Sequence, residues 1–389
     1  GKIQQRKQSR YMKNWFNKDL LEVFLLFAAW RIWITVFALV GIIFLQPYSR
    51  SFFGGGFDNY MGNPLFWGWS NFDGEHYMSI AQYGYKNLQH SFFPLYPLLL
   101  RWFSIPTSLL RLAQSGLIIS NVSFLASLYV LMRLVSKEYG YKVARLTCVS
   151  LLVFPTSFFF GANYTESLFL LLVLLSFYQF NNNNSLTAGL SAMLASAARI
   201  QGMFLFPAYL WGYLKTKNKM YLLTLLLAPL GLVGYLFFLQ KTTGSALSFY
   251  SDLSPFGAQR EVGKLVLFPQ ILWRYIKILT SLEYKNALYL TISLELATAV
   301  IGLALLVLGY VKKLKIEYLI FALLSFILPT LSGSFSSFPR YFVVVFPYFI
   351  LLGSMLSSMP VFWRTSMLLV STILLAVQTM MFLSGYWVA

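Results

Sequence analysis

Residues 20–45 read LLEVFLLFAAWRIWITVFALVGIIFL, an apolar run whose only charged residues are Glu22 and Arg31. An α-helix rises about 1.5 Å per residue and the hydrocarbon core of a bilayer is about 30 Å thick, so roughly 20 apolar residues span it. The run follows a basic N-terminal stretch, but it is too long for a removable signal and has no small-residue cleavage site. We therefore expect a retained first membrane span.

Further apolar runs follow along the whole chain. Hydrophobic residues make up 58% of the 389 residues and charged residues only 11%, which no soluble domain of this length requires. We therefore expect an all-α polytopic membrane protein with about eleven transmembrane helices in one domain, residues 1–389. The expected spans are 20–45, 117–135, 221–239, 288–311 and 367–388, the shorter 143–161, 165–180, 316–331 and 341–357, and the short pair 186–198 and 203–214.

The net charge of +18 raises the question of nucleic-acid binding. The basic residues form no stripe with interleaved aromatic side chains on a soluble domain, so we expect no nucleic-acid partner. Basic residues that set the membrane topology, and basic residues that contact lipid headgroups, explain the excess of positive charge. The single cysteine, Cys148, lies in an apolar run, which excludes disulfides, thiolate metal sites and a cysteine nucleophile.

The basic residues also predict an orientation, because short loops rich in Lys and Arg stay in the cytoplasm. With a cytoplasmic N-terminus, every basic cluster falls on an alternate turn. The outside then receives two long segments, a first outer loop at 46–116 and a second at 240–287. The inside turns carry Arg133, Lys137, Lys142 and Arg145, then Lys215, Lys217 and Lys219, then Lys312, Lys313 and Lys315, and finally Arg364.

Both outer loops are rich in Phe, Tyr, Trp and Pro, which suit the headgroup level of a membrane. Loops of this length in a compact protein are usually functional or disordered, and this composition argues against disorder. We expect a short helix along the membrane at 72–82 and a shallow or re-entrant segment at 91–104, broken by its prolines. A second interfacial helix is expected at 264–279.

The first outer loop contains Asp73-Gly74-Glu75-His76, the densest group of ionisable side chains outside the membrane. On a helix, Asp73 and His76 share one face. A partly desolvated carboxylate there can act as a general base toward a hydroxyl nucleophile. The alternative is that Asp73 caps a helix and Glu75 is exposed. The other histidine, His90, is expected to be solvated.

Charged groups also recur at the outer ends of three other segments. Arginine there can clamp an anionic phosphate through its planar fork of donors. The alternatives are a snorkelling anchor for Arg340 and an ordinary helix N-terminus for Glu166. Within the spans, Arg31 and Glu295 are expected to pair with each other or with backbone groups rather than to act in catalysis. The three segments are Tyr164-Thr165-Glu166-Ser167, Arg199-Ile200-Gln201-Gly202 and Phe338-Pro339-Arg340-Tyr341.

These blocks resemble a known family, GPI mannosyltransferase II, the class V phosphatidylinositol-glycan enzymes and their prokaryotic relatives. The matching blocks occur in order and cover about a fifth of the chain. Where the family usually has Trp, Phe and Ala, this chain has Phe72, Tyr77 and Ser91. The blocks are Phe72-Asp73-Gly74-Glu75-His76-Tyr77, Phe92-Phe93-Pro94-Leu95-Tyr96-Pro97, Phe154-Pro155-Thr156 with Tyr164-Thr165-Glu166-Ser167, Ala198-Arg199 with Gly202, and Gly333-Ser334-Phe335 with Pro339-Arg340-Tyr341.

The resemblance implies a GT-C glycosyltransferase fold, with the active site between the outer loops and the membrane surface. It implies a polyprenyl- or dolichyl-phosphate sugar as donor, with mannose as the family sugar, and inversion in a single displacement. Asp73 is then the base, Arg199 and Arg340 hold the departing lipid phosphate, and His76 assists either the base or the phosphate. The further expected substrate-binding residues are Glu75, Glu166, Tyr164 and Tyr341.

The resemblance leaves the acceptor open between a glycolipid, such as a GPI precursor in eukaryotic members, and a cell-envelope polymer. We expect no required cofactor and no metal site, with a weakly bound Mg²⁺ or Mn²⁺ at Asp73 and Glu75 as the alternative. A lipid-linked sugar flippase or transporter is the competing function, and another sugar or a protein hydroxyl acceptor is the competing chemistry. The expected membrane is a prokaryotic plasma membrane, or the endoplasmic reticulum in a eukaryote.

Overall fold

The computed structural model describes residues 2–48, 50–252, 266–284, 286–331 and 333–388, with side chains from residue 18 onward. Its regular structure is helical, and the described residues contain no strand. The first half comprises α1 (Lys2–Phe44), α2 (Phe57–Gly62), α3 (Pro64–Trp67), α4 (Asp73–Tyr83), α5 (Leu95–Phe103), α6 (Leu109–Tyr139), α7 (Tyr141–Leu152), α8 (Glu166–Asn181), α9 (Ser185–Ala198) and α10 (Leu205–Thr216). The second half comprises α11 (Met220–Leu227), α12 (Leu230–Thr243), α13 (Ser248–Ser251), α14 (Phe268–Ser281), α15 (Ala287–Val311), α16 (Ile316–Thr330), α17 (Phe338–Val343), α18 (Phe346–Ser358) and α19 (Val361–Leu383).

Five helical stretches in the described part of the chain are long and apolar enough to cross a membrane. Each overlaps one of the five clearest expected spans, namely 20–45, 117–135, 221–239, 288–311 and 367–388, so those predictions are confirmed. The third stretch joins α11 and α12, which follow one another at Pro229. The five are Lys18–Phe44, Leu109–Tyr139, Met220–Thr243, Ala287–Val311 and Val361–Leu383.

The shorter apolar runs contain the helices α7, α8, α9, α10, α16 and α18, of 12 to 16 residues each. The expected span at 143–161 is not continuous, because α7 ends at Leu152 and a short 3-10 helix, Ser157–Gly161, follows Pro155. The prediction of a continuous helix at 341–357 is wrong. There α17 ends at Val343 and α18 begins at Phe346. Pro347 has no backbone N–H to continue a helix and disfavours helical geometry in the residue before it, which explains the break.

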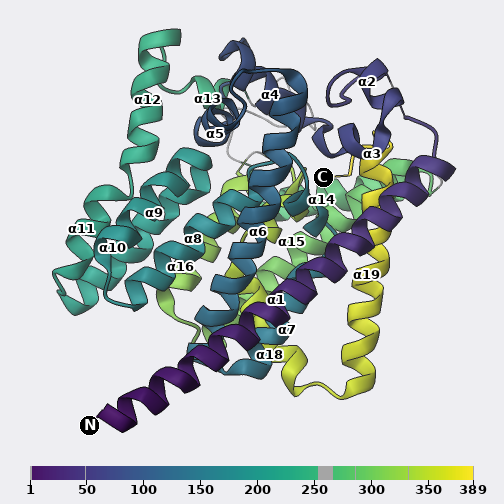
Figure 1. The fold of residues 1–389 in the computed structure, drawn as a ribbon. Helices are drawn as coiled ribbons and strands as arrows, with labels where there is room; N and C mark the ends of the chain where they lie inside the picture. Colours follow the sequence, from purple (N-terminus) through teal and green to yellow (C-terminus); the bar gives the residue numbers. More distant parts are fainter. Residues whose placement is uncertain (1, 49, 253–265, 285, 332, 389) are drawn as a thin grey trace.

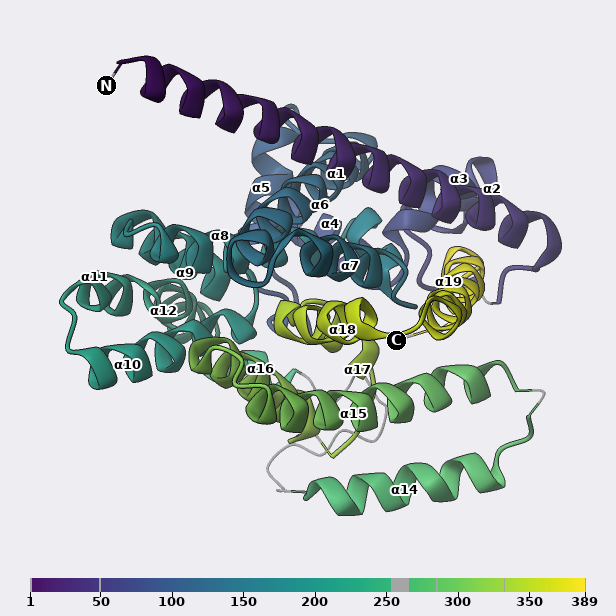
Figure 2. The same ribbon diagram turned by 90° about the horizontal axis from the view of Figure 1, so that it is seen from below.

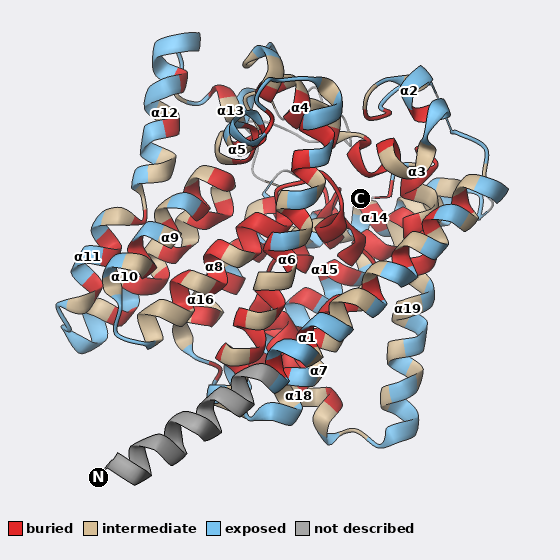
Figure 3. Cartoon of the chain, viewed as in Figure 1, coloured by how far each residue is buried: buried red, intermediate tan, exposed pale blue. Residues whose placement is uncertain are grey.

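Apolar side chains cover the outside of the molecule as well as its centre. The core is densely buried around α8, whereas α1 and α19 expose apolar faces (Figure 3). Leu25, Ile43, Val370 and Ile373 are each more than half exposed. A soluble monomer does not present such a surface to water, and lipid accounts for it. The protein is therefore an integral membrane protein.

The loops separate to two ends of the helical bundle. The basic turns meet at one end, where Lys315 pairs with Glu138 at 2.6 Å and Lys142 donates to the Ser357 carbonyl at 2.7 Å. The elements α2, α4, α5 and α13 gather at the other end, near the C-terminus (Figure 1). The two sets of turns that charge alone assigned to opposite sides thus lie at opposite ends.

The expected helices of the outer loops are present. The expected helix at 72–82 is α4. The segment at 91–104 contains α5, which begins directly after Pro94; Pro97 does not break the segment as expected, because it lies in the first turn of α5, where its missing N–H has no helical partner to lose. The interfacial helix expected at 264–279 is α14, although residues 264 and 265 lie outside the described residues. Figure 2 shows α14 running beside α15.

Candidate active site

Four charged side chains from separate segments form one ion-paired cluster. Arg340 donates through Nε to Glu166 Oε1 at 2.5 Å and through Nη1 to Asp73 Oδ2. Arg199 Nη1 donates to the same oxygen of Glu166. We call Asp73, Glu166, Arg199 and Arg340 the charged cluster.

Each member of the charged cluster lies at the end of a helix. Asp73 and Glu166 are the first residues of α4 and α8, where the partial positive charge of a helix N-terminus favours a carboxylate. Arg199 directly follows α9 in an extended conformation, and Arg340 is the third residue of α17. Helix ends leave side chains free to turn inward across the bundle, which explains why these four can meet.

The structure shows what each of these charged side chains contacts. The residue before α4 is Phe72, and Asp73 makes no capping hydrogen bond because its carboxylate binds Arg340. Glu166 does begin a helix, but it is also fully buried and paired with two arginines. Arg340 is not a snorkelling anchor, since its side chain is only 11% exposed.

Burial and charge oppose each other at Asp73. Burial is the largest single influence and raises the pKa of the Asp73 carboxyl, but the charge and hydrogen bond of Arg340, together with His76 and Arg199, hold that pKa below its ordinary value. Asp73 is therefore ionised at neutral pH. At 23% exposure, it is also the most accessible member of the charged cluster, whereas the Glu166 side chain is fully buried.

Asp73 and Arg340 border a small pocket whose other lining residues are aromatic or apolar. An acid beside a guanidinium can accept a proton from a hydroxyl while the guanidinium binds an anion. Sequence reasoning missed the contribution of the C-terminal residues, because aromatic residues at the end of a span usually indicate contact with headgroups. The lining residues are Phe72, Asp73, Phe159, Tyr164, Arg340, Phe382, Trp387 and Val388.

The two predicted tyrosines hold the arginines by their ring faces. The Arg340 guanidinium lies 4.6 Å from the centre of the Tyr164 ring, and the Arg199 guanidinium lies 5.5 Å from that of Tyr341. Arg199 Nε also donates to Gln201 Oε1 at 3.1 Å, a contact that sequence reasoning missed. The planar guanidinium groups are thus fixed on several sides.

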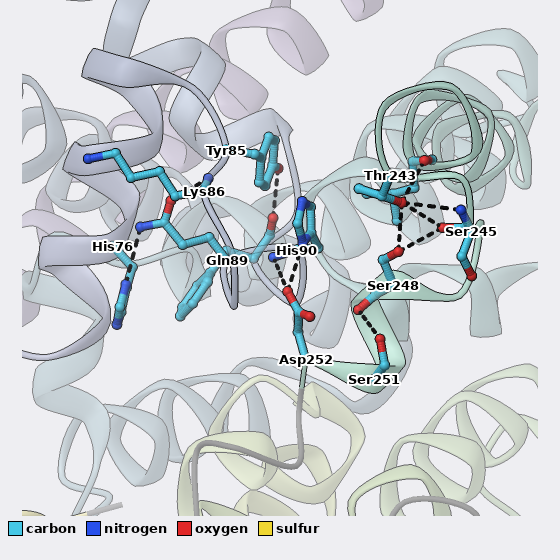
Figure 4. A network of polar contacts seen from close by, with 12 residues as sticks. His76, Tyr85, Lys86, Gln89, His90, Thr243, Ser245, Ser248, Ser251 and Asp252 are labelled. Atoms are coloured by element: carbon cyan, nitrogen blue, oxygen red, sulfur yellow. Dashed lines mark hydrogen bonds and ion pairs between the residues drawn. The ribbon is translucent and has the colours of Figure 1, made fainter.

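His76 and Glu75 lie beside the charged cluster rather than in it. His76 Nδ1 is 3.4 Å from Gln89 Nε2, and its ring stacks on Phe92 at 4.9 Å (Figure 4). Glu75 takes no part in the ion pairs of the described residues, and burial raises the pKa of its carboxyl. Glu75 is only partly accessible, so it does not have the exposed position that the alternative interpretation gave it.

The prediction that His90 is solvated is wrong. Asp252 Oδ2 lies 2.7 Å from His90 Nδ1 and accepts the His90 backbone N–H at 3.0 Å (Figure 4). The Tyr235 hydroxyl donates to the His90 carbonyl at 2.6 Å. The second outer loop and α12 therefore hold the turn of the first outer loop that carries Gln89.

The two charges inside the spans both find backbone partners. Arg31 Nη1 donates to the Gly161 carbonyl at 3.1 Å, and Glu295 Oε1 accepts the Ser337 backbone N–H at 3.0 Å. Glu295 Oε2 also accepts from the Tyr275 hydroxyl at 2.7 Å. The backbone pairing expected from the sequence is confirmed, and Arg31 does not pair with Glu295.

Comparison with known proteins shows that this chain matches the model of a protein family. Residues 18–251 match the family model described as Mannosyltransferase (PIG-V), a stretch that includes Asp73, Glu166 and Arg199. GPI alpha-1,6-mannosyltransferase 2 of Cricetulus griseus is 30% identical over 157 residues, which make up 36% of this chain and 30% of that protein. This chain thus matches less than a third of the length of that curated relative.

Two solved structures are similar at low sequence identity. ArnT from Cupriavidus metallidurans bound to undecaprenyl phosphate has a TM-score of 0.47 and 13% identity, covering 89% of this chain and 63% of that chain. The oligosaccharyltransferase of Archaeoglobus fulgidus in complex with Zn and sulfate has a TM-score of 0.43 and 14% identity, covering 91% and 53%. The family model matches well over half of the present chain, and the chain therefore belongs to the PIG-V mannosyltransferase family.

Proposed function

We propose that this protein is a membrane mannosyltransferase that moves mannose from a polyprenyl- or dolichyl-phosphate donor to a hydroxyl group of a glycolipid or cell-envelope acceptor. The observation that carries the proposal is the charged cluster, in which the accessible carboxylate of Asp73 pairs with Arg340 at the edge of a pocket, and Glu166 links Arg340 to Arg199. Family membership and the partial match to a GPI mannosyltransferase support mannose as the sugar.

The proposed reaction is a single displacement with inversion. Asp73 accepts the proton of the acceptor hydroxyl, whose oxygen forms a bond to the anomeric carbon. The bond between that carbon and the phosphate oxygen breaks, and the lipid phosphate leaves with the electron pair. Arg340 and Arg199 stabilise the charge that develops on the phosphate. The contacts of Arg340 to carboxylates use Nε and Nη1, so its fork of five donors retains N–H groups for a phosphate.

We also propose that transfer requires no metal ion, because the two arginines supply positive charge for a lipid monophosphate. The alternative is that Asp73 and Glu75 bind Mg²⁺ or Mn²⁺ weakly. His76, one turn along α4 from Asp73, is proposed to assist the base or the phosphate. Glu75, Glu166, Tyr164 and Tyr341 are proposed to shape the substrate site.

The proposed topology is a GT-C fold of about eleven membrane spans, in which the helices of 12 to 16 residues also cross or enter the bilayer. The N-terminus is proposed to be cytoplasmic, because the basic turns meet at the end of the bundle opposite the charged cluster. The active site then opens on the non-cytoplasmic face. The membrane is proposed to be a prokaryotic plasma membrane, or the endoplasmic reticulum in a eukaryote.

The test is sugar transfer by the purified protein from polyprenyl-phosphate mannose to a panel of glycolipid acceptors, with and without EDTA. We expect Asp73→Asn to lower the rate by about 10²- to 10⁴-fold, the usual contribution of a general base. Asp58→Asn is the matched control, because Asp58 is an exposed acid of the same loop. EDTA is expected to leave the rate unchanged. Binding of the donor lipid by a wild type that neither transfers nor hydrolyses it would favour a flippase or transporter instead.

A further inference from the structure

Arg340 reaches the charged cluster from a short helix that follows a tightly turned backbone. Ser337, the residue before α17, has a left-handed conformation with φ +63°, which L-residues rarely adopt. Its carbonyl accepts the backbone N–H of Arg340 at 3.0 Å. The position of Arg340 therefore depends on the conformation of Ser337.

A buried carboxylate fixes Ser337 from inside the membrane domain. Glu295 of α15 is 4% exposed, and its Oε1 accepts the Ser337 backbone N–H at 3.0 Å. Two successive hydrogen bonds thus lead from Glu295 through the peptide backbone of Ser337 to Arg340. Glu295 thus supplies the acceptor that holds a residue in a rarely adopted backbone conformation.

Glu295 is itself held from the second outer loop. The hydroxyl of Tyr275 on α14 donates to Glu295 Oε2 at 2.7 Å and lies 3.2 Å from Ser334 Oγ. Both oxygens of Glu295 are thus occupied, one by α14 and one by the backbone before α17. Ionisable groups in spans are costly and are usually retained for a purpose.

We infer that Glu295 is a positioning residue that sets the place of Arg340 for binding the phosphate of the lipid-linked donor. This inference rests on the proposed function. It assigns to Glu295 no contact with substrate and no proton transfer. A misplacement of about 1 Å in a catalytic group can cost on the order of 100-fold in rate. Since only Ser337 stands between Glu295 and Arg340 in the chain of hydrogen bonds, loss of Glu295 is expected to have a measurable effect on the rate.

The principal test variant is Glu295→Met, which keeps the approximate length of the side chain and removes both acceptor oxygens. We expect kcat/KM for polyprenyl-phosphate mannose to fall on the order of 10- to 100-fold. Glu295→Gln keeps an oxygen for the Ser337 N–H and is expected to restore most of the activity. Thr298→Val is the matched control, because the hydroxyl of Thr298 is equally buried in α15 but bonds only to its own helix.

A double-mutant cycle with Arg340→Lys separates positioning from a merely structural role. If Glu295 acts through Arg340, Glu295→Met costs less than about 3-fold once Arg340 is Lys, because coupled residues are not additive. Equal fold-losses in both backgrounds would overturn the inference. Should Glu295→Met fail to fold, Glu295→Asp, which draws the carboxylate back by one methylene group, enters the same cycle with the same expectation.

The failure of this inference differs from the failure of the proposed function. If the wild type is active, Arg340→Lys lowers the transfer rate and Glu295→Met does not, then only the positioning role of Glu295 is rejected and the proposed function stands. A wild type that transfers no sugar from any lipid phosphate rejects the proposed function and this inference with it.

Discussion

Arg340→Met is the most informative single perturbation, because Arg340 bridges two carboxylates. Removal of one partner from a buried ion pair usually costs about 3–5 kcal/mol, since the remaining charge is left uncompensated. Here Glu166 keeps its pairing with Arg199, and Asp73 is 23% exposed to water that screens its charge. We therefore expect a destabilisation near the lower end, about 3 kcal/mol.

The same substitution changes the pH dependence of the proposed transfer. The pKa of Asp73 lies below its ordinary value in the folded protein, so the basic carboxylate is present above that pKa and is lost as the pH falls through it. Without Arg340, burial still raises the pKa of Asp73 and the largest opposing charge is gone. The acid limb of the kcat/KM profile therefore shifts to higher pH, and kcat at neutral pH falls by about 10²- to 10³-fold.

The assay is the initial rate of mannose transfer from about pH 4 to about pH 8, alongside the Tm of the protein in the same detergent. Arg111→Met is the control, since Arg111 is an exposed arginine that donates to the carbonyl of Ile105. An acid limb that stays in place or moves to lower pH would refute the argument that Arg340 holds the pKa of Asp73 down. An unchanged Tm would refute the stabilising role of the ion pair.

Two further substitutions test how the site is supported. Asp252→Ala removes the carboxylate that binds the ring and the backbone N–H of His90, so we expect the free energy of unfolding to fall by about 1.5–3 kcal/mol. Thermal unfolding measures this, with Asp58→Ala as the control because Asp58 is exposed. Equal Tm values for the two variants would contradict the expectation. Gly202→Ala would place a Cβ 2.3 Å from the backbone of α9, so we expect about 3 kcal/mol of destabilisation and a reduced yield of folded protein. Gly62→Ala is the control, because its Cβ would meet no atom within 4 Å. A wild-type yield and Tm for Gly202→Ala would show that α9 can move aside.

The sequence alone was sufficient to determine the long helices. Lipid offers no hydrogen bonds to the backbone, so a run such as 20–45 or 288–311 has to satisfy its own N–H and C=O groups, and a helix does so locally. The same argument located most of the shorter helices. It failed at 143–161 and 341–357, where the effects of Pro155 and Pro347 on the backbone interrupt the helix. The acidic motif at residue 73 was also visible, because so few acids occur in the outer loops.

Only the tertiary structure decided which side chains meet. Asp73 and Arg340 are separated by 267 residues, and no pattern in the sequence gives the distance between two helix ends. The sequence therefore left Arg340 open between an anchor and a phosphate ligand, and it missed both the pairing of His90 with Asp252 and the place of Trp387 in the pocket. Helices form from contacts within a few residues, whereas ion pairs depend on how those helices pack against one another. The interaction energy of two charges depends on the distance between them and on their burial, and packing sets both.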